Sequence, residues 1–131
     1  MKRILISSTL AAALISLGGA GVALADDHVR TGTFTGASNH ITTGTVELVK
    51  TDEGYEIHLK DNFTFDGAPD PRIGFGKDGI FVDPTDFEVL QSNAGAQVYK
   101  VPSSINPEEF DDIFVWCRKF SVPLGVASLS E

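Results

Sequence analysis

The single cysteine of this 131-residue chain is the residue with the most evident chemistry. Cys117 lies in the run Trp116-Cys117-Arg118-Lys119-Phe120 near the C-terminal end. Along an extended strand, side chains alternate between faces, which puts Cys117 and Lys119 on one face and Trp116 on the other. A lysine ammonium on the same face can stabilise a thiolate and make its sulfur reactive. The pattern therefore predicts Cys117 as a redox-active thiol or cofactor ligand, supported by Trp116 and Lys119.

Two other interpretations of Cys117 stay open. Free cysteine is among the most often buried residue types, so Cys117 can be a small core side chain. A lone thiol can also form an intermolecular disulfide. Because the chain has one cysteine, an internal disulfide, a Cys-x-x-Cys redox pair and a cysteine-based zinc site are all excluded.

The histidines and carboxylates carry weaker signals. None of the three histidines has the spacing of a metal-binding motif, and each is expected to be structural. His40, in the turn-like segment 39–44, is kept as a possible weak ligand. Carboxylates cluster at 66–70, 83–88 and 108–112 without the spacing of a calcium loop. We predict no catalytic residue and no metal site.

The N-terminal 25 residues have the pattern of an export signal. A basic start, Met1-Lys2-Arg3, precedes an apolar stretch from residue 4 to residue 24, and Ala23-Leu24-Ala25 has small residues where a signal peptidase reads. Cleavage after Ala25 is expected, giving a periplasmic, secreted or cell-surface protein without stable membrane insertion. An uncleaved membrane anchor is the alternative, since the stretch is just long enough to span a bilayer.

The remaining residues, 26–131, are expected to form one acidic domain. They contain 8 basic and 18 acidic residues, a net charge of −10, because Lys2 and Arg3 lie in the export signal. An acidic surface repels phosphate backbones, so nucleic acid is not an expected partner. A chain of this length forms one core rather than two.

Short segments separated by glycine and proline predict an all-β fold, an antiparallel β-sandwich of about seven to eight short strands. The clearest unit is a hairpin over 44–61, in which alternation turns five side chains inward: Val46, Leu48, Tyr55, Ile57 and Leu59. The apolar run 113–117 predicts a central strand buried on both faces. The last strand is expected over 122–129, with Pro123 at an edge or bulge. Asn106 and Pro107 predict one helical turn.

Over about residues 30 to 130, the chain resembles the DM13 (DM-thirteen) domain family, described as an electron-transfer module. Three groups of segments carry the resemblance. They are Gly32-Thr33-Phe34 with His40 to Val46; Leu59 to Phe63 with Gly67-Ala68-Pro69-Asp70; and Gly95 to Tyr99 with Val101-Pro102, Val115-Trp116-Cys117, Phe120-Ser121-Val122 and Gly125-Val126-Ala127. The resemblance implies that the characteristic cysteine of the family stands at Cys117.

The resemblance also implies a redox function with a partner protein that is not identified. Animal members carry this domain beside DOMON and cytochrome-b-type domains, and they are proposed to pass electrons through the thiol or through a nearby haem. A haem here would be noncovalent, with His40, His58 or Cys117 as a ligand, because the chain has no Cys-x-x-Cys-His motif. We expect this domain to occur alone, without a cytochrome domain beside it. The sequence also departs from the family pattern at Pro71-Arg72, where an apolar residue more usually follows the Asp.

Two hypotheses follow. The first is an exported redox or electron-transfer module that uses Cys117. The second is a non-enzymatic secreted or periplasmic binding or structural β-sandwich with a core cysteine, calcium-dependent adhesion being one variant. Burial of the sulfur discriminates between them: a sulfur that a cleft reaches favours redox chemistry, and one sealed by apolar side chains favours structure.

Overall fold

The computed structural model of the chain describes residues 28–131, so the predicted signal peptide over residues 1–25 lies outside the described residues. The described part is built from short antiparallel strands, which confirms the all-β prediction. The strands are β1 (Val29–Gly36), β2 (Thr42–Thr43), β3 (Thr45–Thr51), β4 (Gly54–Leu59), β5 (Thr64–Phe65), β6 (Pro71–Lys77), β7 (Ile80–Phe81), β8 (Glu88–Val89), β9 (Gln97–Lys100), β10 (Asp112–Cys117) and β11 (Val122–Ser128), with a 3-10 turn η1 (Pro107–Glu109).

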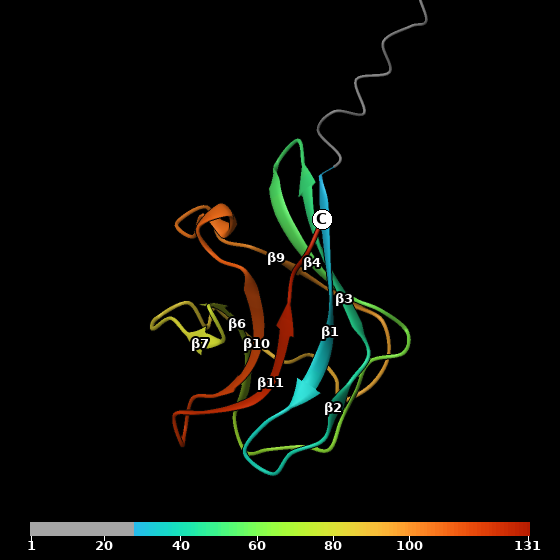
Figure 1. The fold of residues 1–131 in the computed structure, drawn as a ribbon, viewed down its shortest axis with the longest axis vertical. Helices are drawn as coiled ribbons and strands as arrows, with labels where there is room; N and C mark the ends of the chain where they lie inside the picture. The colour runs from blue at the N-terminus through green and yellow to red at the C-terminus, as the bar shows by residue number, and fades with distance from the viewer. Residues whose placement is uncertain (1–27) are drawn as a thin grey trace, which may run out of the picture.

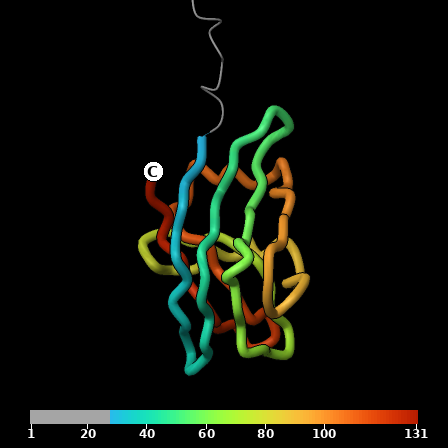
Figure 2. Tube along the Cα trace, turned by 90° about the vertical axis from the view of Figure 1, so that its right-hand side faces the viewer, coloured from blue at the N-terminus to red at the C-terminus, as the bar shows by residue number. Residues whose placement is uncertain are grey.

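The main sheet is continuous and curls into two layers. Its strands follow the order β7-β6-β10-β11-β1-β3-β4-β9, with β8 also paired to β6, while β2 and β5 form a separate pair. Strand β1 belongs to both layers, because 29–33 pair with β3 and 34–36 pair with β11. Figure 2 shows β1, β3, β4 and β9 side by side, with β10 and β11 behind them. The sandwich is therefore one curled sheet (Figure 1).

The predicted hairpin is formed by β3 and β4. Val46 pairs with Leu59 and Leu48 with Ile57, and all four side chains are buried. Tyr55 is partly buried against the same core. This confirms the predicted inward face, and the alternation in the sequence explains it, since residues two apart on a strand share a face.

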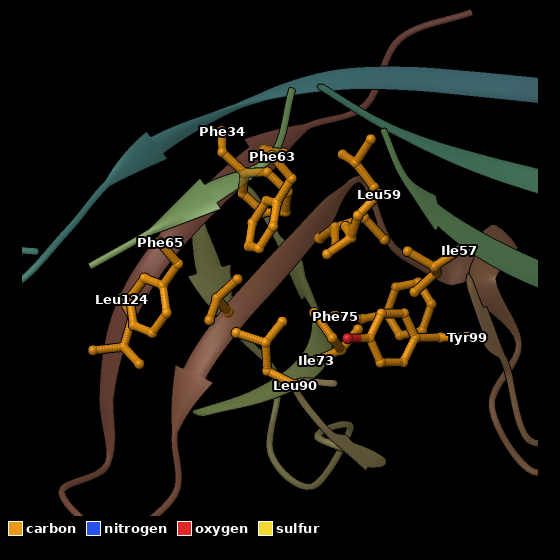
Figure 3. Close-up of a cluster of buried hydrophobic side chains, with 14 of the residues drawn as sticks. Phe34, Ile57, Leu59, Phe63, Phe65, Ile73, Phe75, Leu90, Tyr99 and Leu124 are labelled. Atoms are coloured by element: carbon orange, nitrogen blue, oxygen red, sulfur yellow. The ribbon is translucent and has the colours of Figure 1, made fainter. Parts of the chain in front are cut away.

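The core fills the space between the two layers (Figure 3). Side chains from β1, β4 and β9 meet those of β6, β10 and β11 there, and Phe63, Phe75 and Tyr99 are fully buried. The Tyr99 hydroxyl donates to Gln97 Oε1 at 2.5 Å and accepts from the Gln91 backbone N–H at 2.8 Å. These hydrogen bonds satisfy a polar atom that burial would otherwise penalise.

The C-terminal elements agree with the sequence pattern. Strand β10 lies between β6 and β11, as expected for a central strand, and its pairing with β11 shifts register at Val115/Trp116, opposite Pro123. This confirms a bulge at the proline. Asn106 caps η1, accepting from the Glu108 backbone N–H. No helix within residues 28–131 is long and apolar enough to cross a membrane.

Candidate functional site

Cys117 is the last residue of β10 and points into the core. Its side chain is 1% exposed and belongs to the same cluster as Ile113 and Val115, the alternate residues of the strand. Directly opposite it stand Pro71 of β6 and Val122 of β11. Residues opposite each other in an antiparallel pair share a face, so apolar side chains flank the thiol on both sides. A dissolved disulfide, alkylating agent or peroxide therefore cannot reach the sulfur in this conformation.

The structure corrects the expected position of Lys119. Strand β10 ends at Cys117, and Arg118 to Ser121 form an exposed turn, so the alternation that would put Lys119 beside the sulfur stops one residue after it. The Lys119 ammonium lies 5.5 Å from the centre of the Phe120 ring instead. Lys119 is therefore a surface residue of the β10–β11 turn.

Trp116 lies on the outer face of β10, as predicted, in an aromatic cluster with Phe81 and Phe114. The Phe81 ring of β7 stacks on Trp116, with 3.9 Å between ring centres and 9° between the planes. Phe81 also meets Phe114 edge to face at 5.7 Å. Phe114 is buried, whereas Phe81 and Trp116 stay partly exposed. The outer face of the sheet thus carries a half-buried pair of stacked rings next to Cys117.

Two glycines of β6 make room for this cluster. A Cβ on Gly74 would lie 2.9 Å from Cε2 of Phe81 and 3.0 Å from Cα of Asp86. A Cβ on Gly76 would overlap the Phe114 ring and stand 2.6 Å from the Ile80 carbonyl oxygen. Glycine alone permits the rings to lie this close to the sheet. The alternation Gly74-Phe75-Gly76 was visible in the sequence and marks one bare face of a strand.

A hollow of about 610 Å³ lies beside the stacked rings, lined chiefly by Phe81, Asp83, Pro84, Asp86, Trp116 and Arg118; we call it the Trp116 hollow. Arg118 Nε donates to Asp86 Oδ2 at 2.8 Å, and Arg118 Nη2 donates to the Asp86 carbonyl oxygen at 2.9 Å. The hydrogen bond and the charge of Asp86 raise the pKa of Arg118. This two-point contact fixes the turn after Cys117 to the loop that follows β7.

His40 lies at the separate β2–β5 pair rather than in the Trp116 hollow. Its Nδ1 lies 2.9 Å from Asp66 Oδ1, and the Ile41 backbone N–H donates to Asp66 Oδ2 at 3.0 Å. The hydrogen bond from His40 lowers the pKa of Asp66. The His40 ring packs against Phe65, with 5.8 Å between ring centres. These contacts give His40 a role in joining β2 to the loop after β5.

The surroundings of Cys117 do not fit a haem. The sulfur is enclosed by a packed core, so a macrocycle would have to displace side chains that hold the two layers together. The Nε2 atoms of His58 and His28 lie 3.0 Å from the carboxylates of Glu56 and Glu131. Within residues 28–131, no three His, Cys, Asp or Glu side chains are grouped so that they could hold a metal ion.

Alternation along the strand predicted Arg118 on the face of Trp116, but nothing in the sequence identified Phe81 or Asp86 as their neighbours. Phe81 and Asp86 come from one segment, and Trp116 and Arg118 come from a second segment about 30 residues later. The sheet pairing of β6 with both β7 and β10 brings the two segments together. The sequence offered one signal, the Arg118 cation directly after Cys117, which favours a carboxylate partner. Because the chain has many carboxylates, the sequence does not identify which of them is the partner.

Comparison with known proteins agrees with the resemblance found in the sequence. The family model described as "Electron transfer DM13" matches residues 33–129, from β1 through β11 and including His40, Trp116 and Cys117. No curated protein and no solved structure matches the chain. The family description indicates a redox or electron-transfer function, which in general requires a redox partner. Because the match covers most of the sequence, the chain belongs to the electron-transfer DM13 family.

Proposed function

We propose that this protein is an exported electron-transfer domain in which the Cys117 thiol is the redox group. The expected export signal ends at Ala25, and β1 begins at Val29, so cleavage there would leave every described strand in the mature chain. The mature protein would act in the periplasm, outside the cell or at the cell surface. The family match supports the redox part of the proposal.

The contrast between Cys117 and its neighbour Trp116 carries the proposal. Cys117 is 1% exposed, whereas Trp116, directly before it in the chain, is partly exposed at the Trp116 hollow. An electron can move along this covalent path without contact between the sulfur and solvent, whereas a dissolved reagent needs that contact. The geometry thus favours electron transfer over thiol–disulfide exchange.

The proposed step involves one electron and one proton. The thiol gives one electron to a one-electron oxidant docked at the surface, and its proton passes to water when the exposed turn after β10 opens transiently over the sealed sulfur. The product is a neutral thiyl radical. An electron from a reduced partner and a proton from water regenerate the thiol. No bond between Cys117 and the partner forms in this step.

Voltammetry of the protein adsorbed on an electrode tests the proposal. A one-electron, one-proton couple should have a midpoint potential that falls by about 59 mV per pH unit. The wave should be absent in Cys117→Ser and Cys117→Ala, and circular dichroism should show that at least one of these variants is folded. A folded variant that retains the wave, or a wild-type protein without one, would overturn the proposal.

The burial of Cys117 supports a second candidate, a secreted binding or structural domain with a core cysteine. Apolar neighbours on both sides of the sulfur are what a purely structural cysteine requires. In this case the wild-type protein has no thiol wave, and Cys117→Ala lowers only its stability. The calcium-dependent variant of this function would raise the melting temperature when calcium is added.

A further inference from the structure

We propose that the Trp116 hollow is the docking site for a basic electron-carrier protein, whose lysine or arginine side chains would surround its own redox group. The role of the partner as an electron carrier rests on the proposed function. The docking surface itself rests on the shape, charge and position of the hollow.

The hollow and its rim offer apolar contact area on the outer face of the sheet. The stacked rings of Phe81 and Trp116 form one wall. A row of cross-strand partners runs from the hollow across the sheet: Trp116 of β10 pairs with Arg72 of β6, and Arg72 pairs with Val89 of β8. Val89 therefore lies on the same face as Trp116, at the far end of this row. Val89 is 49% exposed. Aromatic side chains in a shallow surface with a polar rim are typical of protein interfaces.

The charge of the hollow selects a cationic partner. The Arg118 guanidinium is already bound by Asp86, so these two charges neutralise each other within the lining. Asp83 is exposed at the rim and, within residues 28–131, is not among the residues that form ion pairs. The lining therefore keeps one negative charge, on a mature chain whose net charge would be −10. Complementary charge accelerates the encounter of two proteins and orients them.

The packing of the hollow is fixed before a partner arrives. Gly74 holds the Phe81 ring and the Asp86 backbone directly on β6, and Arg118 joins the β10–β11 turn to Asp86 by two hydrogen bonds. A surface that needs no rearrangement loses less conformational entropy on binding.

The hollow also lies where a partner would be nearest to the thiol along the chain. Trp116 and Arg118, the residues on either side of Cys117, both line it. A carrier seated there would face the indole that adjoins the Cys117 backbone. The electron path would then cross one residue between the surface and the sulfur.

Binding of a basic cytochrome c, used as the probe, tests the docking site through two pairs of matched variants. Asp83→Lys reverses a charge at the hollow, and Asp52→Lys makes the same change in the exposed turn between β3 and β4. Val89→Ser and Val98→Ser remove valines of nearly equal exposure, 49% and 48%, from β8, which pairs with β6, and from β9, which pairs with β4 in the other layer. Calorimetry and stopped-flow mixing measure the Kd and the association rate at low and high salt.

We expect Asp83→Lys to weaken binding about tenfold at low salt, mostly through slower association, and this loss to shrink as salt screens the charges. Val89→Ser should weaken binding by about twofold to fivefold. Asp52→Lys and Val98→Ser should stay within about twofold of the wild type. Equal effects within each pair, or no effect of either hollow variant, would overturn the docking site.

The Cys117→Ser variant separates this inference from the proposed function. It should bind the cytochrome as the wild type does, because Cys117 is not part of the surface. Binding at the hollow without a thiol wave in the wild type means that the proposed function fails and the docking site stands. A thiol wave in the wild type, together with unchanged binding in the hollow variants, means that the proposed function stands and the docking site fails.

Discussion

The Phe81 ring lies parallel to the Trp116 indole at a centroid distance of 3.9 Å, and it covers the outer face of β10 beside Cys117. Phe81 also covers Phe114, which is only 1% exposed. The two rings come from strands on either side of β6, so their contact ties the short β7 strand to the centre of the sheet.

Phe81→Ala should therefore expose both Trp116 and Phe114. We expect the free energy of unfolding to fall by about 2 kcal/mol, less than for a fully buried phenylalanine because Phe81 is partly exposed. The emission of Trp116, the single tryptophan, should shift to longer wavelength. Phe120→Ala removes the same ring from a 59% exposed position and should change neither quantity appreciably. Equal unfolding free energies for the two variants would contradict the role of the stack.

Gly74→Ala tests the close approach of Phe81 and Asp86 to β6. The added methyl group would meet a ring carbon at 2.9 Å and a backbone carbon at 3.0 Å, so the loop has to shift. We expect a loss of about 1–3 kcal/mol in denaturant unfolding. In the double variant with Phe81→Ala, one of the two clashes is gone, and the combined loss should be smaller than the sum. Strict additivity would show that the ring and the glycine are independent.

Cys117→Ser should lower stability, because the hydroxyl is buried among apolar side chains without a good partner. The expected loss is about 1–3 kcal/mol, measured by denaturant unfolding. Cys117→Ala introduces no polar atom and separates this effect from the loss of volume. Iodoacetamide should label the wild-type thiol only after unfolding, since Cys117 is buried in the folded protein. Rapid labelling of the folded protein would contradict the sealed position.

Both tyrosines should resist ionisation in the folded protein. Desolvation and the hydrogen bond to Glu108 together raise the pKa of Tyr55 to about 12. Burial raises the pKa of Tyr99 to about 12 as well. The folded state holds these protons more tightly than the unfolded state, whose phenols have a pKa of 10.0. Stability should therefore fall as the pH rises from about 10 to about 12. Ultraviolet titration should show little phenolate at pH 10 until the protein is unfolded.

Single phenylalanine substitutions distinguish the contributions of Tyr55 and Tyr99 to stability. Tyr55→Phe removes the hydrogen bond of 2.5 Å to Glu108, which joins β4 to η1, and should lower the free energy of unfolding by about 1 kcal/mol. Tyr99→Phe should cost more, because Gln97 Oε1 and the Gln91 N–H would both lose a partner inside the protein. The opposite order would contradict these assignments.

The buried carboxyl group of Asp112 should make the stability of the protein depend on pH in the acidic range. Its carboxylate accepts the Gly79 backbone N–H at 2.7 Å and the Ser128 hydroxyl at 3.1 Å, and burial raises its pKa above the ordinary value of 3.8. The folded state binds this proton more tightly than the unfolded state. The contribution of Asp112 to stability is thus complete below pH 3.8 and is lost as the pH rises through its folded-state pKa.

Asp112→Asn should remove this pH dependence. The amide oxygen can still accept from Gly79, and the amide N–H can donate to the Ser128 hydroxyl. We expect higher stability than wild type at neutral pH and a flatter profile of unfolding free energy against pH. Asp52→Asn makes the same charge change on the exposed β3–β4 turn and should leave the shape of the profile unchanged. A destabilised Asp112→Asn protein at pH 7 would contradict the prediction.

Local patterns in the sequence were sufficient for the individual strands. The alternation from Val46 to Leu59 fixed the inward face of the hairpin, because side-chain direction on a strand repeats every two residues. The apolar run 113–117 identified the central strand, and the cap at Asn106 identified the 3-10 turn. Three groups of segments, of which the group with Val115-Trp116-Cys117 is the most specific, also indicated the family that the comparison then matched.

Side chains alternate between faces only while the strand continues. The prediction that Lys119 lies beside the Cys117 sulfur was wrong because the strand ends at Cys117. The sequence alone does not state that β10 ends at Cys117; the β10–β11 turn and the pairing with Pro71 and Val122 determine it. The sequence determined that Cys117 lies on a buried strand, whereas the tertiary structure decided that apolar side chains seal its sulfur and that Lys119 lies outside.

The curl of the sheet and the Trp116 hollow belong wholly to the tertiary structure. Strand β1 pairs with β3 along one half and with β11 along the other, and the pattern of its own residues specifies neither partner. Phe81, Asp86 and Arg118 likewise come together through the pairing of β6 with its neighbours. Local propensities are set by residues close in the chain. The contact of Asp86 with Arg118 joins residues about 30 positions apart, and the pairing of β1 with β11 joins residues about 90 apart, so only the packing of the whole chain selects them.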